Sequence, residues 1–245
     1  MSYIWNKNKM EFNHNENIPP SFRMLIVGSS GCGKTQLLFK MLLTPGYLDY
    51  DNLIIFSKTI SQDEYQILYH SFLNKLSKES ISKIFDEQDQ FDSSLSIKEI
   101  CETYSQLYPE NNPITISMYD KLDQIMNPSD LDKNKKNLIV FDDCVTLKNQ
   151  EVMSSYYTRG RHNNCNSIYL SQSWFDLPKK TIRNNSNFIV LFKLNKRDKD
   201  LIYNDLLSNT LEKEEFNMII YNHWNKEYNY IVYDKTKDDL LKDLF

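Results

Sequence analysis

Short apolar runs recur along the chain and alternate with polar stretches of helical character. Each run has about the length of a β-strand, and several are built from β-branched or aromatic residues. The seven runs are residues 24–27, 53–56, 114–118, 138–141, 167–170, 188–192 and 228–233. Several are continuous rather than alternating, which is typical of strands that helices cover on both faces. The pattern predicts an α/β fold with a mostly parallel central sheet flanked by helices.

The longest stretch between two of these runs, residues 59–112, carries apolar side chains at helical spacings. They are Tyr65, Leu68, Phe72, Leu73, Leu76, Ile81, Ile84 and Phe85. We therefore expect a mainly helical insertion between early strands. Residues 1–22 are predicted to form an N-terminal extension and residues 235–245 a C-terminal tail. Within the tail, Leu240, Leu241, Leu244 and Phe245 also follow a helical spacing.

Size and composition favour a single α/β domain over residues 1–245, because 40% of the side chains are hydrophobic and can fill a sizeable core. The net charge of -4 argues against a protein coated in positive charge, as a nonspecific DNA-binding monomer would be. No apolar run is long enough for a membrane helix, and the polar start lacks a signal-peptide core. We expect a soluble intracellular protein with no membrane-spanning segment, whose four cysteines are reduced and hold no zinc.

Residues 28–35 read Gly-Ser-Ser-Gly-Cys-Gly-Lys-Thr, a complete GxxxxGKT phosphate-binding loop directly after an apolar run. In such a loop the backbone NH groups surround the phosphates, Lys34 reaches the β and γ phosphates, and the Thr35 hydroxyl ligates Mg²⁺. Helix-forming residues follow at once, so the positive end of a helix points at the anion. The sequence predicts a nucleoside triphosphate site. Its residues are Gly28, Ser29, Ser30, Gly31, Cys32, Gly33, Lys34, Thr35 and Gln36.

A second apolar run, residues 138–141, ends in the paired carboxylates Asp142 and Asp143, as a Walker B strand does. Asp142 is predicted to hold Mg²⁺, and Asp143 to orient or deprotonate the attacking water. Two adjacent carboxylates repel each other, and a nearby cation is the natural reason to tolerate them at the end of a buried strand. The alternative is a strand that stops at a polar turn.

Gln172 follows another apolar run and is a candidate sensor of the γ-phosphate, because neighbouring strand tips in a parallel sheet lie close enough to share one ligand. It could equally be an ordinary strand terminus. Between the two runs, Gly160 is suited to end a helix and to leave Arg159 and Arg161 near its tip. An arginine that reaches a γ-phosphate stabilises transition-state charge, whereas the alternative for both residues is a surface salt bridge.

Four segments in fixed order carry a family resemblance: GSSGCGKT, NLIVFDD, YTRGRHNN and SIYLSQSWFDLPKKTIRNNSNFIVLFK. Together they strongly resemble the genome-packaging ATPases of poxvirus-like large DNA viruses and virophages, within the FtsK/HerA superfamily. The resemblance extends from about Arg23 to Phe192. It implies a RecA-like core that assembles as a homo-oligomeric ring, a hexamer or pentamer, hydrolyses ATP with Mg²⁺ and threads double-stranded DNA into a preformed capsid.

The roles that the resemblance implies fall on residues already named. They are Lys34 and Thr35 for the phosphate loop, Asp142 and Asp143 for Walker B, Gln172 for the sensor, and Arg159 or Arg161 for an arginine finger. Of the two arginines, Arg161 is favoured as the residue inserted into a neighbour's site. Asp143 is shorter than the Glu that many relatives in the wider superfamily carry there.

The resemblance also implies capsid or inner-virion proteins as partners, and a location in the host-cell cytoplasm or viral factory, with association with the virion as a further option. DNA would be gripped through its phosphates by basic side chains on the pore side of the ring. The densest basic segment contains Lys179, Lys180, Arg183, Lys193, Lys196, Arg197 and Lys199, and its alternative is a solvated charge run. The C-terminal tail would dock on a neighbouring subunit or the capsid, or cap the core.

Two other functions share the phosphate loop. One is a nucleotide-binding scaffold or switch of the virion that has no productive turnover, against which the paired Asp142 and Asp143 argue. The other is a different P-loop phosphotransferase, such as a small-molecule or nucleoside kinase, which would need an acceptor pocket and a lid.

Overall fold

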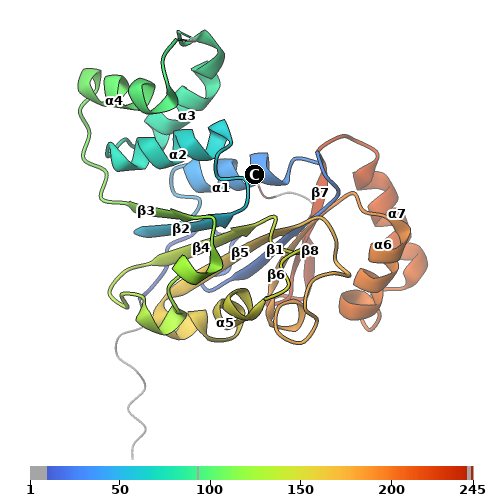
Figure 1. Ribbon diagram of the computed structural model, residues 1–245. Coiled ribbons are helices and arrows are strands. Elements are labelled where there is room, and N and C mark those ends of the chain that lie inside the picture. The colour runs from blue at the N-terminus through green and yellow to red at the C-terminus, as the bar shows by residue number, and fades with distance from the viewer. Residues whose placement is uncertain (1–9, 93, 242–243, 245) are drawn as a thin grey trace, which may run out of the picture.

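An eight-stranded sheet forms the centre of the computed structural model, which describes residues 10–92, 94–241 and 244 (Figure 1). The strand order is β3-β2-β4-β5-β1-β6-β7-β8. The strands are β1 (Arg23–Val27), β2 (Asn52–Ser57), β3 (Thr115–Tyr119), β4 (Asn137–Asp142), β5 (Cys165–Ser171), β6 (Phe188–Phe192), β7 (Tyr230–Asp234) and β8 (Asp239–Leu241). From β3 to β6 every neighbouring pair is parallel, whereas β7 and β8 pair antiparallel. The predicted α/β fold with a mostly parallel sheet is confirmed.

Helices connect the parallel strands and cover both faces of the sheet (Figure 1). The helices are α1 (Lys34–Leu43), α2 (Asp63–Leu73), α3 (Lys78–Glu87), α4 (Ile97–Leu107), α5 (Glu151–Arg159), α6 (Lys196–Ile202) and α7 (Lys213–Trp224). Short helical turns add η1 (Gln88–Gln90), η2 (Leu122–Gln124), η3 (Pro128–Asp130), η4 (Gly160–Asn163), η5 (Arg183–Asn185) and the π-helical η6 (Tyr203–Leu207). Among the described residues, no helix combines the length and the apolar character needed to span a membrane.

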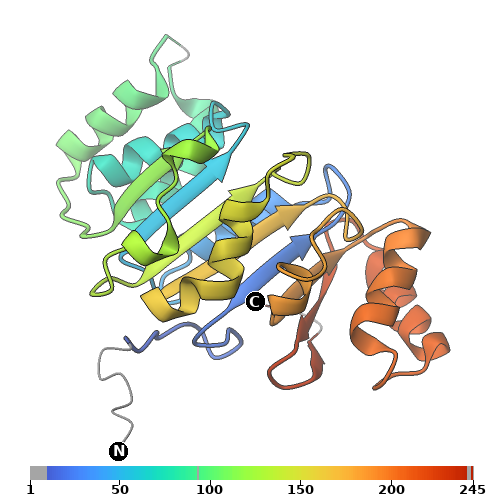
Figure 2. The ribbon, with the colours of Figure 1, turned by 60° about the horizontal axis from the view of Figure 1, so that its bottom comes forward.

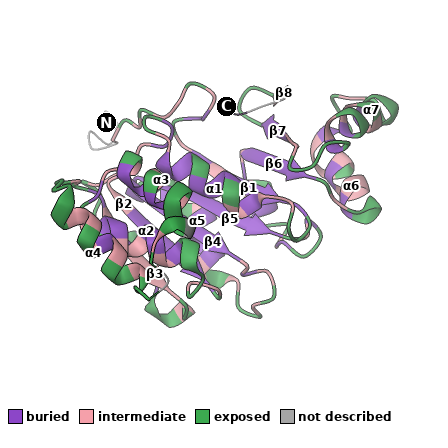
Figure 3. Cartoon of the chain, turned by 90° about the horizontal axis from the view of Figure 1, so that it is seen from above, coloured by how far each residue is buried: buried purple, intermediate pink, exposed green. Residues whose placement is uncertain are grey.

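Two layers of apolar side chains hold the helices to the sheet. In β1, Met24 and Ile26 belong to the layer under α1, α2 and α3, and Leu25 and Val27 to the layer under α5, α6 and α7. Successive side chains of a strand point to opposite faces, so a continuous apolar run supplies both layers at once. The strands are accordingly buried while exposed residues gather on the outer surfaces of the helices (Figure 3).

The predicted elements are present, with strand boundaries that shift by two residues at most. The segment 59–112 contains α2, α3 and α4, so the mainly helical insertion is confirmed as well. Two of its helices, α3 and α4, begin at side-chain caps: the Ser77 hydroxyl accepts the NH of Ser80, and Ser96 forms a capping box with Glu99.

The apolar residues of the tail follow a helical spacing, but its described part forms a strand. Asp239–Leu241 forms β8, in which Leu240 pairs with Tyr233 of β7. An edge strand offers a row of unpaired backbone groups, and pairing with it outweighs a helical spacing of only a few leucines. Leu244 is buried in the core layer under α1, where its carbonyl accepts the Tyr47 hydroxyl at 2.7 Å. Residues 242, 243 and 245 lie outside the described residues.

The six parallel strands end at one edge of the sheet, which we call the carboxyl edge, and begin at the opposite amino edge. Figure 2 shows these strands side by side with α5 packed across them. Because β4, β5 and β1 are consecutive in the sheet, the residues that follow them meet at the carboxyl edge. The predicted phosphate loop, Walker B pair and sensor all follow one of these three strands.

Candidate nucleotide-binding and catalytic site

The phosphate loop connects β1 to α1, and glycine is required there at two positions for different reasons. A Cβ on Gly28 would lie 2.5 Å from the Cβ of Phe192 and 2.6 Å from the Cys32 Sγ, so a larger residue would separate the loop from β6. Gly33 has φ of 98°, a left-handed conformation that side chains other than glycine's rarely adopt. The loop can therefore turn tightly and remain close to the sheet.

Backbone NH groups of this loop are available as hydrogen-bond donors. Those of Ser30, Gly31 and Gly33 have no acceptor among the residues that the structure describes. They lie at the start of α1, where the helix dipole adds partial positive charge and where no side chain caps the helix. Donors and dipole together make a cradle for a phosphate-like anion.

Lys34 lies across this cradle and is almost completely buried. Its Nζ donates to the carbonyl oxygens of Gly28 at 2.7 Å and Ser29 at 2.9 Å. Thr35 is the second residue of α1. The amide of Gly28 in turn donates to the carbonyl of Ser171 at 3.1 Å, which ties the loop to the tip of β5.

Asp142, the last residue of β4, is buried with 9% of its surface exposed. The Tyr65 hydroxyl of α2 donates to its Oδ2 at 2.5 Å. Burial raises the pKa of the Asp142 carboxyl and the charge of Asp143 raises it too, whereas the Tyr65 hydrogen bond and the charge of Lys34 lower it. Asp142 and Lys34 thus interact electrostatically across β5, and a cation at this place would favour the ionised carboxylate.

Asp143 and Gln172 meet at the tips of β4 and β5. The Gln172 Nε2 donates to the Asp143 Oδ1 at 3.3 Å. Asp143 has φ of 53°, an uncommon conformation for a residue other than glycine, so the backbone leaves the extended conformation directly after β4. The structure therefore brings together Lys34, Asp142, Asp143 and Gln172 at the carboxyl edge.

Arg159 and Arg161 lie at the amino edge, away from this group. Arg159 ends α5 and Arg161 belongs to η4. Asn164, the residue after η4, accepts the backbone NH of Asn137 at the start of β4 through its carbonyl oxygen. Burial lowers the pKa of Arg23, the first residue of β1, and the charge of nearby Arg161 lowers it further. Strand β1 separates this edge from the phosphate loop by about 16 Å at 3.3 Å per residue.

Both arginines are exposed, and neither forms an ion pair within the described part of the chain. The alternative of a surface salt bridge therefore finds no support there. Because Arg159 and Arg161 lie at the far edge of the sheet, neither can reach phosphates bound in the loop of its own chain. Action on a neighbour's site stays a prediction.

The basic segment divides into two parts with different environments. Lys179 and Arg183 bind the two oxygens of Asp205 at 2.7 and 2.6 Å, and Arg183 is buried with its guanidinium 5.6 Å from the Trp174 ring. These contacts give Arg183 a structural role and remove it from the residues available to DNA. Five cations of the segment are exposed, namely Lys180, Lys193, Lys196, Arg197 and, despite its ion pair with Asp205, Lys179, whereas Lys199 is partly exposed.

Tyr65 is a site residue that sequence reasoning missed, since its helical spacing identifies it only as an apolar position of the insertion. The spacing does predict that Tyr65 is buried, but its contact with Asp142 joins residues 77 positions apart. A buried tyrosine hydroxyl needs a polar partner, and that requirement is the one available signal.

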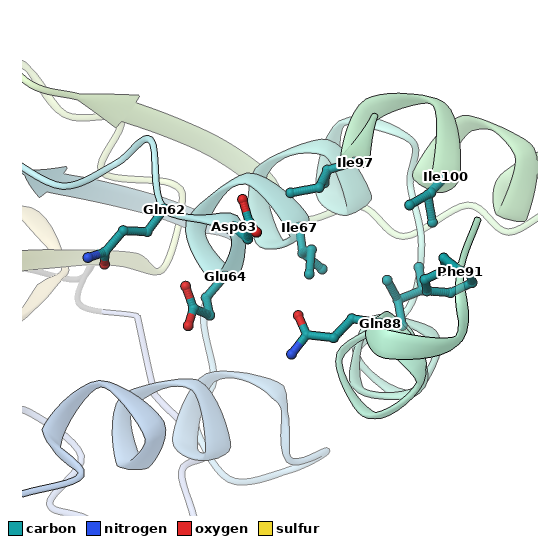
Figure 4. A pocket seen from close by; sticks show the side chains of 9 residues that line it. Gln62, Asp63, Glu64, Ile67, Gln88, Phe91, Ile97 and Ile100 are labelled. Carbon is teal, nitrogen blue, oxygen red and sulfur yellow. The ribbon is translucent and has the colours of Figure 1, made fainter. Parts of the chain in front are cut away.

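A separate cavity of about 580 Å³ lies within the helical insertion (Figure 4). Asp63, Glu64, Gln88, Ile67 and Ile97 are among the residues that line it. Acidic and apolar side chains dominate this lining, and no lysine or arginine is among the described residues that form it, so the cavity does not suit a phosphate group. None of the predicted site residues lines it.

No protein-family model and no curated protein sequence matches the chain. Solved structures do share its fold. The genome packaging NTPase B204 from Sulfolobus turreted icosahedral virus 2, in complex with AMPPCP, aligns with a TM-score of 0.52 and 12% identity over 91% of this chain and 97% of that chain. Its AMP complex gives a TM-score of 0.53 and 12% identity over 93% and 100% of the two chains.

The DNA-packaging ATPase B204 from Sulfolobus Turreted Icosahedral Virus aligns with a TM-score of 0.53 and 10% identity, over 91% of this chain and 97% of that chain. These identities establish a shared fold and not a shared activity. The alignments cover nearly the full length of each chain, so the α/β fold with a mostly parallel central sheet that these NTPase structures share applies to this chain as a whole.

Proposed function

We propose that the chain is an ATP-hydrolysing motor that moves double-stranded DNA into a preformed viral capsid. The observation that carries the proposal is the convergence of the phosphate loop with Asp142, Asp143 and Gln172 at one edge of the sheet. The fold shared with the packaging NTPase B204 supports the DNA-packaging part, together with the sequence resemblance to the FtsK/HerA superfamily.

ATP with Mg²⁺ fits the residues of this edge. The loop offers backbone donors and Lys34 to the phosphates, and the repulsion between Asp142 and Asp143 calls for a cation beside them. Thr35 and Asp142 would hold Mg²⁺, which would supply positive charge to neutralise the phosphates. The roles of these residues remain part of the proposal.

The chemistry assigned to the chain is hydrolysis of the terminal phosphoanhydride bond. Asp143 accepts a hydrogen bond from the attacking water and orients it, and Gln172, bonded to Asp143, contacts the γ-phosphate. Lys34 neutralises charge on the β and γ phosphates. Arg161, or Arg159 in its place, adds positive charge from an adjacent subunit of a hexameric or pentameric ring.

Partners and location follow from the same proposal. The exposed cations Lys180, Lys193, Lys196 and Arg197 would bind DNA phosphates without reading bases, which suits a motor that must move any sequence. Capsid or inner-virion proteins would receive the DNA. The protein would act in the host-cell cytoplasm or viral factory and could remain with the virion.

The test is a steady-state ATPase assay on the purified chain, with and without double-stranded DNA. We expect DNA to stimulate hydrolysis and Lys34→Ala to abolish it at an unchanged fold, with a loss of about 10³-fold or more. Lys40→Ala, a lysine on the exposed face of the same helix, serves as control and should retain turnover. A rate of ATP hydrolysis that changes neither on addition of DNA nor in Lys34→Ala would contradict the proposal.

The same assay separates the two alternatives. A scaffold or switch binds ATP without turnover, and a phosphotransferase passes phosphate to an acceptor other than water. Direct measurement of bound nucleotide, released phosphate and phosphorylated nucleosides distinguishes all three functions.

A further inference from the structure

A tyrosine next to the phosphate loop adopts a backbone conformation that usually requires glycine. Tyr228 lies in the turn between α7 and β7, where the NH of Asn229 donates to the carbonyl of Lys226 at 3.5 Å. Its φ is 62°, in the left-handed region. A bulky aromatic residue is uncommon in that region, and such strained positions concentrate at active sites and ligand clamps.

The ring of Tyr228 lies against the start of α1. A Cβ on Gly33 would be 3.2 Å from the Tyr228 Cδ1, so the ring edge contacts the backbone of the phosphate loop. The residue is nevertheless 59% exposed. The ring thus borders the loop while leaving much of its surface available for contact with a ligand.

A cavity of about 270 Å³ opens at this place. Its wall consists of the loop residues Ser29, Ser30, Gly31 and Cys32, the residues Phe192 and Lys193 at the end of β6, and the turn 224–229. This cavity lies on the β6 side of β1, whereas Asp142, Asp143 and Gln172 lie on the β5 and β4 side. The phosphate loop therefore separates the catalytic carboxylates from the cavity.

The two sides suit the two ends of a nucleoside triphosphate. The carboxylates attract the cation that accompanies the γ-phosphate, and the Gln172 amide can donate to that phosphate, so the remainder of the nucleotide must extend away from them. On the other side the chain offers an exposed aromatic ring and a cavity that adjoins the phosphate cradle. Aromatic rings bind nucleobases by stacking, and stacking tolerates any base because every base has a π-face.

We propose that Tyr228 is the base-stacking residue of the nucleotide site and that the cavity beside it receives a purine base. The proposal rests on the proposed function, since it requires a triphosphate in the loop. A purine covers more of the ring than a pyrimidine does. Since the ring face does not distinguish adenine from guanine, ATP and GTP should depend on Tyr228 alike.

The experiment compares binding of ATP and of inorganic tripolyphosphate, both with Mg²⁺, to the full chain by titration calorimetry. Tripolyphosphate occupies the loop but has no base. We expect Tyr228→Ala to weaken ATP binding by about 5- to 150-fold, the range for one stacked base, and to leave tripolyphosphate binding unchanged. Tyr228→Phe should retain ATP affinity within about twofold, because it retains the ring.

Two further variants separate stacking from other effects of the substitution. Tyr228→Gly relieves the strain of the left-handed backbone conformation but removes the ring. It should therefore weaken ATP binding as much as Tyr228→Ala does. Tyr221→Ala removes another exposed tyrosine, on α7, that does not line this cavity. This variant should bind ATP and tripolyphosphate with unchanged affinity. Retained ATP affinity in Tyr228→Gly, or an equal loss of both ligands in Tyr228→Ala, would overturn the stacking role.

Failure of the proposed function gives a different result. If Lys34→Ala changes the binding of neither ligand, the loop does not hold phosphates and the nucleotide site itself is refuted. If Lys34→Ala weakens both ligands while Tyr228→Ala leaves ATP affinity unchanged, only the stacking role is refuted.

Discussion

The two edges of the parallel sheet carry different kinds of charged residue in different surroundings. At the carboxyl edge, Lys34, Asp142 and Asp143 interact with one another and with hydrogen-bonding partners. At the amino edge, Arg159 and Arg161 are exposed, and they form no ion pair among the described residues. The carboxyl edge holds most of the groups that we propose for phosphate chemistry, whereas the amino edge presents charge outward. A head-to-tail ring would bring such unlike surfaces together, because a heterologous interface joins two different patches.

Removal of an outward-facing arginine gives the largest expected effect. We expect Arg161→Ala to lower turnover of the assembled protein by about 10³- to 10⁵-fold while the isolated chain retains its stability within about 0.5 kcal/mol. Arg159→Ala tests the competing assignment. The measurement is ATPase activity of mixtures with wild-type chains, and an arginine that acts across subunits gives a nonlinear loss with composition. A linear fall of ATPase activity with the fraction of variant chains, for both variants, would contradict a role of the amino edge in a neighbour's site.

At the carboxyl edge, Asp143→Asn should lower turnover by about 10²- to 10⁴-fold, the range for a group that orients or deprotonates water. Its amide oxygen can still accept the hydrogen bond from Gln172, so the strand tips should stay together. ATP affinity should remain near wild type, as calorimetry would measure. Full turnover in Asp143→Asn would transfer the role to another residue.

Arg183 serves as the control arginine for Arg161, because its guanidinium already pairs with Asp205 and lies over the Trp174 ring. We expect Arg183→Ala to lower the free energy of unfolding by about 2 kcal/mol. This loss is smaller than that for breaking a fully buried ion pair, because Asp205 keeps its ion pair with Lys179. Turnover per folded molecule should change little. Denaturant unfolding measures the first quantity and single-concentration ATPase assays the second. A catalytic loss without a stability loss would contradict the structural role.

Tyr65→Phe has the smallest expected effect and tests whether the Tyr65 hydroxyl controls the ionisation of Asp142. Loss of a hydrogen bond to a carboxylate should cost about 1 to 2 kcal/mol of unfolding free energy. The Tyr65 bond lowers the pKa of Asp142, so its removal raises that pKa further above the ordinary value. Because metal binding needs the ionised carboxylate, turnover should begin to fall at a higher pH in the variant than in wild type as the solution is acidified.

Tyr50→Phe is the control for this variant. Tyr50 is buried in the same core layer and donates to the neutral carbonyl of Leu42 at 2.8 Å. Loss of the Tyr50 hydroxyl should lower the free energy of unfolding but leave the acid limb of the pH profile of turnover unchanged. An identical profile for Tyr65→Phe and wild type would show that the hydroxyl does not set the ionisation of Asp142.

Most of the fold could be predicted because the strands are buried on both faces, and burial dictates an apolar run that the sequence displays directly. The phosphate loop could be predicted because its chemistry is local, with all its residues in one turn. The contact between Tyr65 and Asp142 could not, since it depends on how the insertion packs on the sheet. Strand β8 was missed for a similar reason, because the edge of β7 that stabilises it is not visible in the residues of the tail.

The position of the two arginines was only partly predictable. The sequence places Arg159 and Arg161 at a helix tip, and α5 does end at Arg159. In an alternating α/β chain, however, a helix that follows one strand returns to the start of the next, so its tip belongs to the amino edge. That topological step separates the arginines from their own phosphate loop.

The hydrogen bond from Tyr65 to Asp142 also has a mechanical meaning. Tyr65 belongs to the first turn of α2, and this helix packs against α3 and α4. A displacement of the helical insertion away from the sheet would have to stretch or break that bond, and the acidity of Asp142 would then change. A force applied at the outer surface of the insertion would thereby be converted into a change in the proton affinity of one carboxylate.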